Sequence, residues 1–277
     1  MAVLRCGLVG AGIGASLSPA LHEAEGRHQG LDLSYTLFDV DRLGRELDDA
    51  ERDGFAGLNI THPFKQQVID QLDDLSPQAR AIGAVNTVVF RDGKRHGHNT
   101  DAYGFTEAFR AKLPGARTGH VVQLGAGGAG AACAHALLGL GAERLTIVDP
   151  DATRGVELAG RLGAAHTAAA TPELLAGADG LVNASPIGMH HHPGMPLPAE
   201  SLHRDLWVVD IVYMPVVTEL LRAARAAGAR AVGGTAMCAY QAAAAFQLFT
   251  GLPPDTARML RHVDALLAAR PSWSARC

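Results

Sequence analysis

One segment near the middle of the chain, Val121–Asp149, constrains the fold more than any other. Residues typical of a strand (VVQL) lead into GAGGAG, a helical pattern rich in Ala and Leu follows, and a second apolar run (LTIV) ends in Asp149. The glycines of such a GxGxxG pattern have separate tasks: a tight turn, close approach of the backbone to a pyrophosphate, and close packing of the helix on the strand. Free amide groups at the helix start would hold the phosphates. The full strand–turn–helix–strand context therefore predicts a dinucleotide site. Its expected phosphate loop consists of Gly125, Ala126, Gly127, Gly128, Ala129 and Gly130.

Charge and hydropathy argue against several classes of partner. The chain has 277 residues and a net charge of −4, and the absence of any Lys/Arg run argues against nucleic acid or a membrane surface as a partner. No uncharged apolar stretch reaches the roughly 18 residues of a membrane span. The N-terminus enters a strand pattern directly, without a signal-peptide layout. We therefore expect a cytoplasmic protein with a small-molecule substrate.

The cysteines and histidines do not form a metal-binding pattern. Four cysteines are scattered without a CxxC pair, so neither a disulfide scaffold nor a zinc site is expected. Three consecutive histidines, at 190–192, lie between Gly188 and Pro193-Gly194, which indicates a loop. No neighbouring Cys or acid has the spacing of a metal site, so we predict no metal.

Strand and helix patterns alternate along the whole chain, which predicts a two-domain α/β protein. The alternation before the glycine loop predicts an N-terminal domain with an open, largely parallel α/β sheet, and the glycine loop opens a C-terminal Rossmann domain. We place the domains at 1–103, completed by C-terminal helices 242–277, and at 104–241. Strands are expected at Cys6–Gly10, Ser34–Val40, Phe55–Ile60, Gly180–Ala184, Trp207–Val212 and Ala229–Val232, with a hairpin joining Val85–Phe90 to Arg95–His98 through Asp92-Gly93. Helices are expected at Pro19–Gln29, Arg42–Arg52, Asp101–Lys112, Ala152–Leu162, Thr218–Ala227, Thr235–Phe249 and Pro254–Ala268.

Two polar clusters follow strands of the first domain. Ser16 and Ser18 follow the first strand and, two residues apart in extended chain, can present both hydroxyls to one carboxylate. Alternatively, Ser18 only caps the next helix, with Pro19 at its first position. In NITHPFK, Pro63 favours a helix start, which would place Lys65 in the first turn against the helix dipole. A cation placed against local preference is a candidate functional group, although a solvated surface lysine remains the alternative.

Two further clusters carry polar side chains in apolar surroundings. Asn86 interrupts an apolar strand, where a buried amide needs a partner. Asp101 either caps the next helix or shares a proton with Lys65. Near the C-terminus, Met237 and Gln241 are four residues apart and share one face of a helix; taken alone, they indicate packing and a solvated amide.

With these clusters in view, the chain resembles the shikimate/quinate dehydrogenases over essentially its whole length. The motifs SLSP, NITHPFK, GAVNT, NTD, GAGGAG, NASPIGM, DIVYMP with Thr218, and GGTAM followed by Gln241 occur in the order of that family. The resemblance implies an N-terminal substrate domain, a Rossmann domain and a catalytic Lys–Asp pair, Lys65 and Asp101. It implies substrate contacts from Ser16, Ser18, Thr61, Asn86, Asp101, Tyr213 and Gln241. It places Met189, Val212, Tyr213, Gly234 and Met237 around the nicotinamide and implies a further cofactor contact from Ser185.

Two positions depart from the biosynthetic members of the family. Ala15 stands where these usually carry a histidine, and VDPDATR replaces the Asn-Arg-Thr motif that receives the 2′-phosphate of NADP. An acid such as Asp149 accepts from the ribose 2′-hydroxyl of NAD and repels a phosphate. We therefore expect NAD rather than NADP, although Arg154 leaves room for NADP. This version resembles the catabolic, NAD-dependent quinate/shikimate branch.

The expected activity is reversible oxidation of the C3 hydroxyl of shikimate or quinate by a monomer or homodimer. An NADP-dependent biosynthetic enzyme and an aminoshikimate-pathway dehydrogenase are the related alternatives. A non-catalytic ligand-sensing protein is the alternative from another class.

Overall fold

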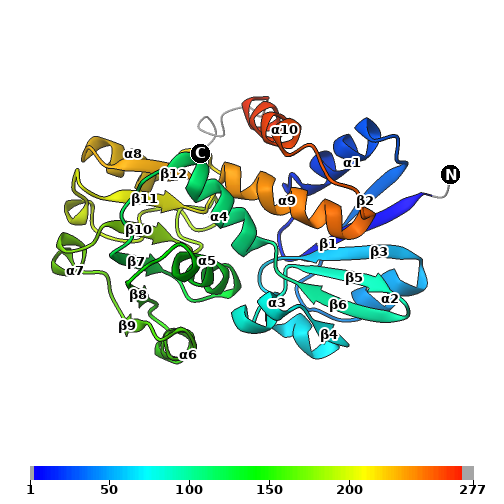
Figure 1. Ribbon diagram of the computed structural model, residues 1–277, viewed down its shortest axis with the longest axis horizontal. Helices are drawn as coiled ribbons and strands as arrows, with labels where there is room; N and C mark the ends of the chain where they lie inside the picture. Colours follow the sequence, from blue (N-terminus) through cyan, green and yellow to red (C-terminus); the bar gives the residue numbers. More distant parts are fainter. Residues whose placement is uncertain (1–2, 270–277) are drawn as a thin grey trace. The chain divides into compact units, whose positions relative to one another are not determined.

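The structure, a computed structural model, describes residues 3–269, and the chain divides into two compact units. Unit 1 is formed by the described parts of residues 1–76, 85–100 and 239–277, and unit 2 by Pro77–Ala84 and Asp101–Cys238. Each unit is built around one six-stranded sheet (Figure 1), which confirms the predicted two-sheet α/β fold. Cys277 and the outermost residues of the predicted ranges 1–103 and 242–277 lie outside the described residues.

The sheet of unit 1 is mixed, with the order β2-β1-β3-β5-β6-β4. Its strands are β1 (Leu4–Gly10), β2 (Leu33–Asp39), β3 (Phe55–Ile60), β4 (Asp74–Leu75), β5 (Thr87–Arg91) and β6 (Lys94–His98). Strand β1 pairs in parallel with β2 and β3, whereas β5 and β6 form an antiparallel hairpin. Asp92 and Gly93 join the hairpin with φ of 54° and 67°, the left-handed conformation that a two-residue turn requires. The predicted hairpin is therefore confirmed.

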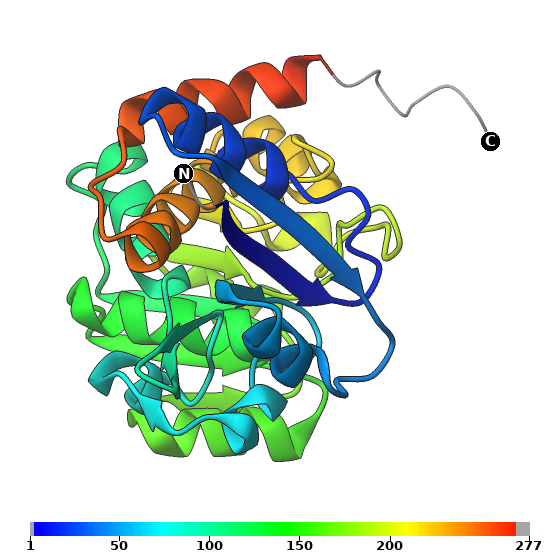
Figure 2. The same cartoon turned by 90° about the vertical axis from the view of Figure 1, so that its right-hand side faces the viewer.

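Helices α1 and α9 cover one face of this sheet. The helices of the unit are α1 (Ser18–His28), α2 (Glu46–Arg52), a 3₁₀ turn η1 (Gln67–Gln71) and α10 (Thr256–Ala268), together with the greater part of α9 (Thr235–Thr250). Phe246 and Phe249 of α9 pack with Cys6 of β1 and Tyr35 of β2 in one buried cluster. Figure 2 shows α1, α9 and α10 gathered beside β1 and β2. Helix α2 begins at Glu46, later than predicted, because residues 41–45 form bends and irregular chain before a first turn rich in acids.

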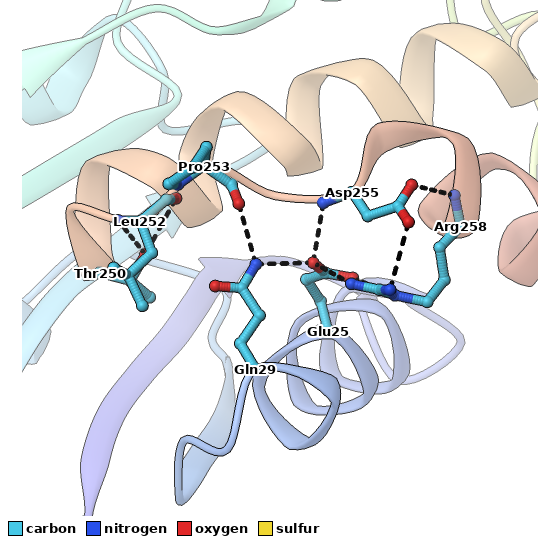
Figure 3. A network of polar contacts seen from close by, with 7 residues as sticks. All are labelled: Glu25, Gln29, Thr250, Leu252, Pro253, Asp255 and Arg258. Carbon is cyan, nitrogen blue, oxygen red and sulfur yellow. Dashed lines mark hydrogen bonds and ion pairs between the residues drawn. The ribbon is translucent and has the colours of Figure 1, made fainter.

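A buried ion pair fixes α10 to α1 (Figure 3). Glu25 of α1 is 1 % exposed and accepts hydrogen bonds from Nε and Nη2 of Arg258 at 2.8 and 2.7 Å. The amide of Asp255 and the side chain of Gln29 also donate to Glu25. Burial alone would raise the pKa of Glu25, but these donors together hold the pKa below its ordinary value. The C-terminal helix is thus anchored to the helix whose first residue is Ser18.

Unit 2 is a parallel sheet with the order β12-β11-β10-β7-β8-β9. Its strands are β7 (His120–Leu124), β8 (Arg144–Val148), β9 (Ala165–Thr167), β10 (Gly180–Asn183), β11 (Trp207–Asp210) and β12 (Arg230–Gly233). Its helical segments are α3 (Pro77–Ile82), α4 (Asp101–Lys112), α5 (Gly128–Gly139), α6 (Ala152–Leu162), α7 (Pro172–Ala176), the 3₁₀ turn η2 (Ala199–Ser201), α8 (Glu219–Ala226) and the first turn of α9. The chain moves outward from β7 to β9 and then returns to β10 on the other side of β7. Ligands bind at such a switch point, beside the carboxyl ends of the strands.

Successive side chains of β7 lie on opposite faces of this sheet. Val122 and Leu124 of β7 pack with Leu175 of α7 and Leu220 of α8. Gln123, between them, lies on the opposite face and donates to the carbonyl of Gly130 in α5. Among the described residues, no helix has the length and apolar character needed to cross a membrane.

Candidate functional site

The glycine turn of unit 2 has three differently constrained glycines. Gly125 has φ +96°, and a Cβ there would lie 2.7 Å from the carbonyl oxygen of Ala184. A Cβ at Gly130 would collide with the backbone carbonyl of Gly125, whereas a Cβ at Gly127 would meet no atom within 4 Å. The three positions therefore match a tight turn, an open approach for a ligand, and close packing of helix on strand.

The amide groups at the start of α5 are oriented for a phosphate. The first backbone bond of the helix runs from the amide of Ala131 to the carbonyl of Gly127, so the preceding amides at 128–130 have no partner within the helix. Such amides, at the positive end of the helix dipole, bind anionic groups. The side-chain amide of Gln123 stabilises the turn by donating to the carbonyls of Gly125 and Gly130, both at 2.9 Å. The residues present thus fit the pyrophosphate of a dinucleotide.

Asp149 follows β8 and is almost completely buried, at 3 % exposed. Its Oδ2 accepts from the amide of Ala126 at 2.8 Å, and its Oδ1 accepts from the amide of Asp151 and from Arg154 Nη2. Burial would raise the pKa of Asp149, but the hydrogen bonds from Arg154, Ala126 and Asp151 hold it below the ordinary value. Asp149 therefore stays ionised and holds the glycine turn in place, a task that the sequence analysis did not foresee.

Arg154 forms an ion pair with Asp149, the residue predicted to bind the ribose. Its guanidinium lies 3.0 Å from Asp149 and its side chain is 47 % exposed. The structure therefore brings Asp149, Arg154 and the glycine turn together, as predicted from the sequence. Arg154 also neutralises part of the negative charge of Asp149, which was expected to repel the 2′-phosphate of NADP.

The loops after β10 and β11 hold most of the predicted nicotinamide contacts. Ser185 and Met189 lie in the first loop and Val212 and Tyr213 in the second. Gly234 packs against the second loop, since a Cβ there would collide with the carbonyl of Ile211. Unit 2 thus collects these residues at the carboxyl ends of its central strands.

In unit 1, the two predicted serines contact each other. Ser16 Oγ donates to Ser18 Oγ at 3.2 Å, and the amide of Ser18 donates to Ser16 Oγ at the same distance. Helix α1 begins at Ser18, and its N-cap residue, Leu17, makes no side-chain cap, so the alternative of Ser18 as a capping residue is wrong. The carboxylate of Asp39, at the end of β2, accepts from the amides of Gly12 and Ile13 and so fixes the loop that carries the serines.

The helix predicted at Lys65 is absent. Residues 62–66 form turns after β3, and regular 3₁₀ structure begins only at Gln67. The carbonyl of Lys65 accepts from the amide of Val85 at 2.7 Å, so a distant segment, rather than a helical ladder, defines the backbone here. Lys65 therefore does not oppose a helix dipole, contrary to the prediction, although it follows the carboxyl end of β3 as predicted.

Asn86 lies in a buried hydrogen-bond network of unit 1. Its Oδ1 accepts from the amide of Thr100 at 2.7 Å, and its Nδ2 donates to Thr100 Oγ1 at 2.8 Å. Asn59 of β3 donates to Thr87 Oγ1 and to the carbonyl of Asn86, and accepts from Tyr35 Oη at 2.6 Å. The partner that the sequence required for this amide is thus Thr100, and Asn59 is an additional member that the sequence analysis missed.

The remaining predicted residues occupy the expected elements. Asp101 is the first residue of α4 and is buried, Thr61 directly follows β3, and Met237 and Gln241 lie four residues apart in α9. Lys65 belongs to unit 1 and Asp101 to unit 2, and their proposed pairing stays a prediction.

The polar residues that sequence reasoning missed share one signal. Gln123, Asn183 and Asn59 are uncharged polar residues within otherwise apolar strands, each within two positions of the strand end. A buried amide in such a place requires partners. Gln123 and Asn183 bond to the turns that follow their strands, and Asn59 bonds to side chains of β2 and β5. Within residues 3–269, no group of three His, Cys, Asp or Glu side chains forms a metal site.

Comparisons with known proteins agree on one family. The model of the shikimate dehydrogenase substrate binding domain matches residues 8–88, and that of the shikimate 5′-dehydrogenase C-terminal domain matches residues 234–263. The shikimate dehydrogenase (NADP(+)) of Streptomyces avermitilis is 56 % identical over 94 % of each chain. The quinate/shikimate dehydrogenase (NAD(+)) of Corynebacterium glutamicum is 46 % identical over 91 % of this chain and 95 % of the relative.

The fold agrees with the sequence comparisons. A solved structure of quinate dehydrogenase from Corynebacterium glutamicum in complex with NAD matches with a TM-score of 0.87 and 44 % identity. The match covers 95 % of this chain and 99 % of that one.

Proposed function

Since the chain belongs to the shikimate dehydrogenase family, we propose that it is an NAD-dependent dehydrogenase that oxidises the C3 hydroxyl of shikimate or quinate, reversibly. The observation that carries this proposal is the open glycine turn with Asp149 fixed beside it. One relative named for shikimate and one named for quinate and shikimate support it. The expected cytoplasmic location and the monomer or homodimer stay predictions.

We assign the proton transfer to Lys65, which would accept the proton of the C3 hydroxyl. Asp101 would orient the neutral amino group of Lys65 and relay the proton onward from the ammonium group that forms. Ser16 and Ser18 would bind the substrate carboxylate through their hydroxyls, and Asn86 would donate from its amide to a ring hydroxyl. The nicotinamide, when bound, takes up the hydride.

The preference for NAD is supported by the acids that follow β8. Asp149 and Asp151 place two carboxylates beside a single cation, Arg154, which is already bound to Asp149. A 2′-phosphate would have to compete with Asp149 for that guanidinium. Against this stands the relative at 56 % identity, which is named for NADP(+), while the Corynebacterium relative is named for NAD(+).

Initial rates with shikimate, quinate and an amino analogue, each with NAD and with NADP, test the proposal. We expect NAD to be preferred by about 10²-fold in kcat/KM, because a hydrogen bond to a charged group contributes roughly 1.5–3 kcal/mol and each 1.4 kcal/mol is tenfold. Equal use of NADP would refute the cofactor assignment. Tight substrate binding without turnover would instead support a ligand-sensing protein.

Lys65→Ala tests the catalytic assignment separately. We expect kcat to fall by about 10²-fold or more with nearly unchanged affinity for NADH, since general acid–base groups contribute roughly 10²–10⁴-fold. Lys94→Ala, at an exposed position of the β5–β6 hairpin, is the matched control and should leave kcat unchanged. A higher KM with unchanged kcat would make Lys65 a binding residue only.

A further inference from the structure

Asp210, the last residue of β11, is a carboxylate buried without a cation. It is 0 % exposed, and no Lys, Arg or His within the described chain forms an ion pair with it. Its Oδ1 accepts from the amide of Val212 at 3.1 Å and from Asn183 Nδ2 at 2.9 Å, and its Oδ2 accepts from Thr218 Oγ1 at 2.6 Å. Each of these partners is a donor, as an ionised carboxylate requires.

On one side, these bonds fix the loop 211–218. The bond from Val212 closes the turn directly after β11, and the bond from Thr218 closes its far end. The same Thr218 oxygen accepts from the amide of Leu221 and thereby caps α8. Asp210 therefore ties both ends of the loop that carries Val212 and Tyr213 to the end of the strand.

On the other side, Asp210 fixes the loop 185–189 through Asn183. Nδ2 of Asn183 donates to Asp210 and to the carbonyl of Ile187 at 3.0 Å. Its Oδ1 accepts from both the amide and the hydroxyl of Ser185. A Cβ built on Gly188 would lie 3.8 Å from Asp210 Oδ2, so the backbone of this loop passes directly over the carboxylate.

An apolar residue at 210 would avoid the cost of a buried charge. Desolvation of a carboxylate costs several kcal/mol, which its hydrogen bonds only partly offset. Burial accordingly raises the pKa of Asp210, against the lowering effect of Thr218, Val212 and Asn183. The carboxylate instead fixes the geometry of the site, because its hydrogen bonds hold two loops in position.

We propose that Asp210 is a positioning residue that holds the loops 185–189 and 211–218 as one platform for the nicotinamide half of the cofactor. The inference rests on the proposed function, because it takes the cofactor contacts that the family resemblance implies for Ser185, Met189 and Val212. Asp210 touches neither cofactor nor substrate in this scheme and acts through the loops.

The test removes one donor to Asp210 and compares two ligands. Thr218→Val keeps the shape of the side chain but removes the hydroxyl, and Thr218→Ser keeps the hydroxyl. For Thr218→Val we expect a fall in kcat of about tenfold or more and weaker binding of NADH. Binding of ADP-ribose, which lacks the nicotinamide, should stay within about twofold. Thr218→Ser should restore the wild-type values.

Thr171→Val is the matched control for the loss of a helix cap. Thr171 caps α7 as Thr218 caps α8, by accepting from the amide of Leu174, but it has no bond to Asp210. It should lower stability to a similar extent, through the lost cap, and leave kcat and both affinities unchanged. Asp210→Asn is the stronger variant, and Thr218→Val keeps the test decisive if Asp210→Asn does not fold.

Several results would overturn the inference. These are an unchanged kcat and NADH affinity in Thr218→Val, an equal loss of NADH and ADP-ribose binding, or the same kcat loss in Thr171→Val. If the wild-type protein turns over neither shikimate nor quinate, the proposed function fails. The ratio of NADH to ADP-ribose affinity still decides the role of Asp210 in that case.

Discussion

At the scale of single residues, His22 of α1 has an unusual environment. It is 0 % exposed, and neither ring nitrogen has a hydrogen-bond partner within the described residues. The ring stacks on Tyr35 with centroids 4.7 Å apart and lies near Phe246 and Phe249. Burial lowers the pKa of His22 from 6.5 to about 3. The folded chain therefore keeps His22 neutral at pH values where an unfolded chain binds a proton.

We predict that the free energy of unfolding of His22→Phe falls less in mild acid than that of the wild-type protein. Above pH 6.5 His22 is neutral in both the folded and the unfolded chain, and its contribution to the free energy of unfolding is fully present. It is lost as the pH falls from 6.5 towards 3, by about 1.4 kcal/mol per pH unit. Between pH 7 and pH 5 the wild-type protein should therefore lose about 2 kcal/mol more than His22→Phe, measured by urea unfolding.

The same substitution at an exposed histidine of the same helix, His28→Phe, is the control and should follow the wild-type pH dependence. Equal acid losses in wild type and His22→Phe would show that His22 does not stay neutral in the folded chain.

At the scale of elements, two nearby glycines of the glycine turn have different tasks. Gly130 is needed for packing within the fold, and Gly127 is needed for ligand binding. We predict that Gly130→Ala lowers the free energy of unfolding by about 1–3 kcal/mol, because the added methyl group meets the Gly125 carbonyl. Gly127→Ala should fold normally, since Gly127 has φ −71° and open space around it, but should weaken NADH binding tenfold or more. Thermal unfolding and NADH fluorescence titration measure the two effects.

Gly160→Ala, in the interior of α6 with no atom near the new methyl group, is the control for a glycine replaced within a helix. It should raise stability by up to about 1 kcal/mol without changing NADH affinity. Unchanged NADH binding in Gly127→Ala would contradict the assignment of the phosphate loop.

Elements with local signals could be predicted closely, and those set by distant partners could not. Helix α6 has the predicted bounds, Ala152–Leu162, because Asp151 caps its start and Gly163 ends it with φ 65°. The segment at Lys65 has equally helical local residues, but its backbone bonds to Val85.

The candidate site shows the same limit. The glycine turn and Asp149 could be located from one continuous motif. The tasks of Gln123, Asn183 and Asp210 depend on contacts between separate strands and loops, whose register no local pattern defines.

At the scale of the whole molecule, the two units differ in how the chain builds them. Almost all of unit 2 comes from one continuous segment, 101–238, whereas unit 1 needs residues from both ends of the chain. Phe246 and Phe249 of the C-terminal segment lie in the same buried cluster as Cys6 and Tyr35. The first hundred residues therefore lack part of their own core.

We predict that a fragment of residues 101–238 folds and binds ADP-ribose, whereas a fragment of residues 1–100 does not fold alone. A fusion of residues 1–100 to residues 239–269 through a flexible linker should restore cooperative unfolding, because it returns α9 to the sheet. Near-UV circular dichroism and thermal unfolding report folding, and calorimetry reports ADP-ribose binding. Cooperative unfolding of residues 1–100 alone would show that α9 is dispensable for that core.

The split construction of unit 1 has a consequence during synthesis on the ribosome. The strands β1, β2 and β3 are made first together with α1, but α9, the second helix on the same face, is completed only after residues 101–238. At about 5–20 residues per second, this delay is on the order of ten seconds. During that time the apolar surface that Phe246 and Phe249 cover in the folded chain lacks these partners, and transiently exposed apolar surface of this kind favours aggregation. The nascent chain should therefore bind chaperones before residue 239 is made and be released once α9 has emerged.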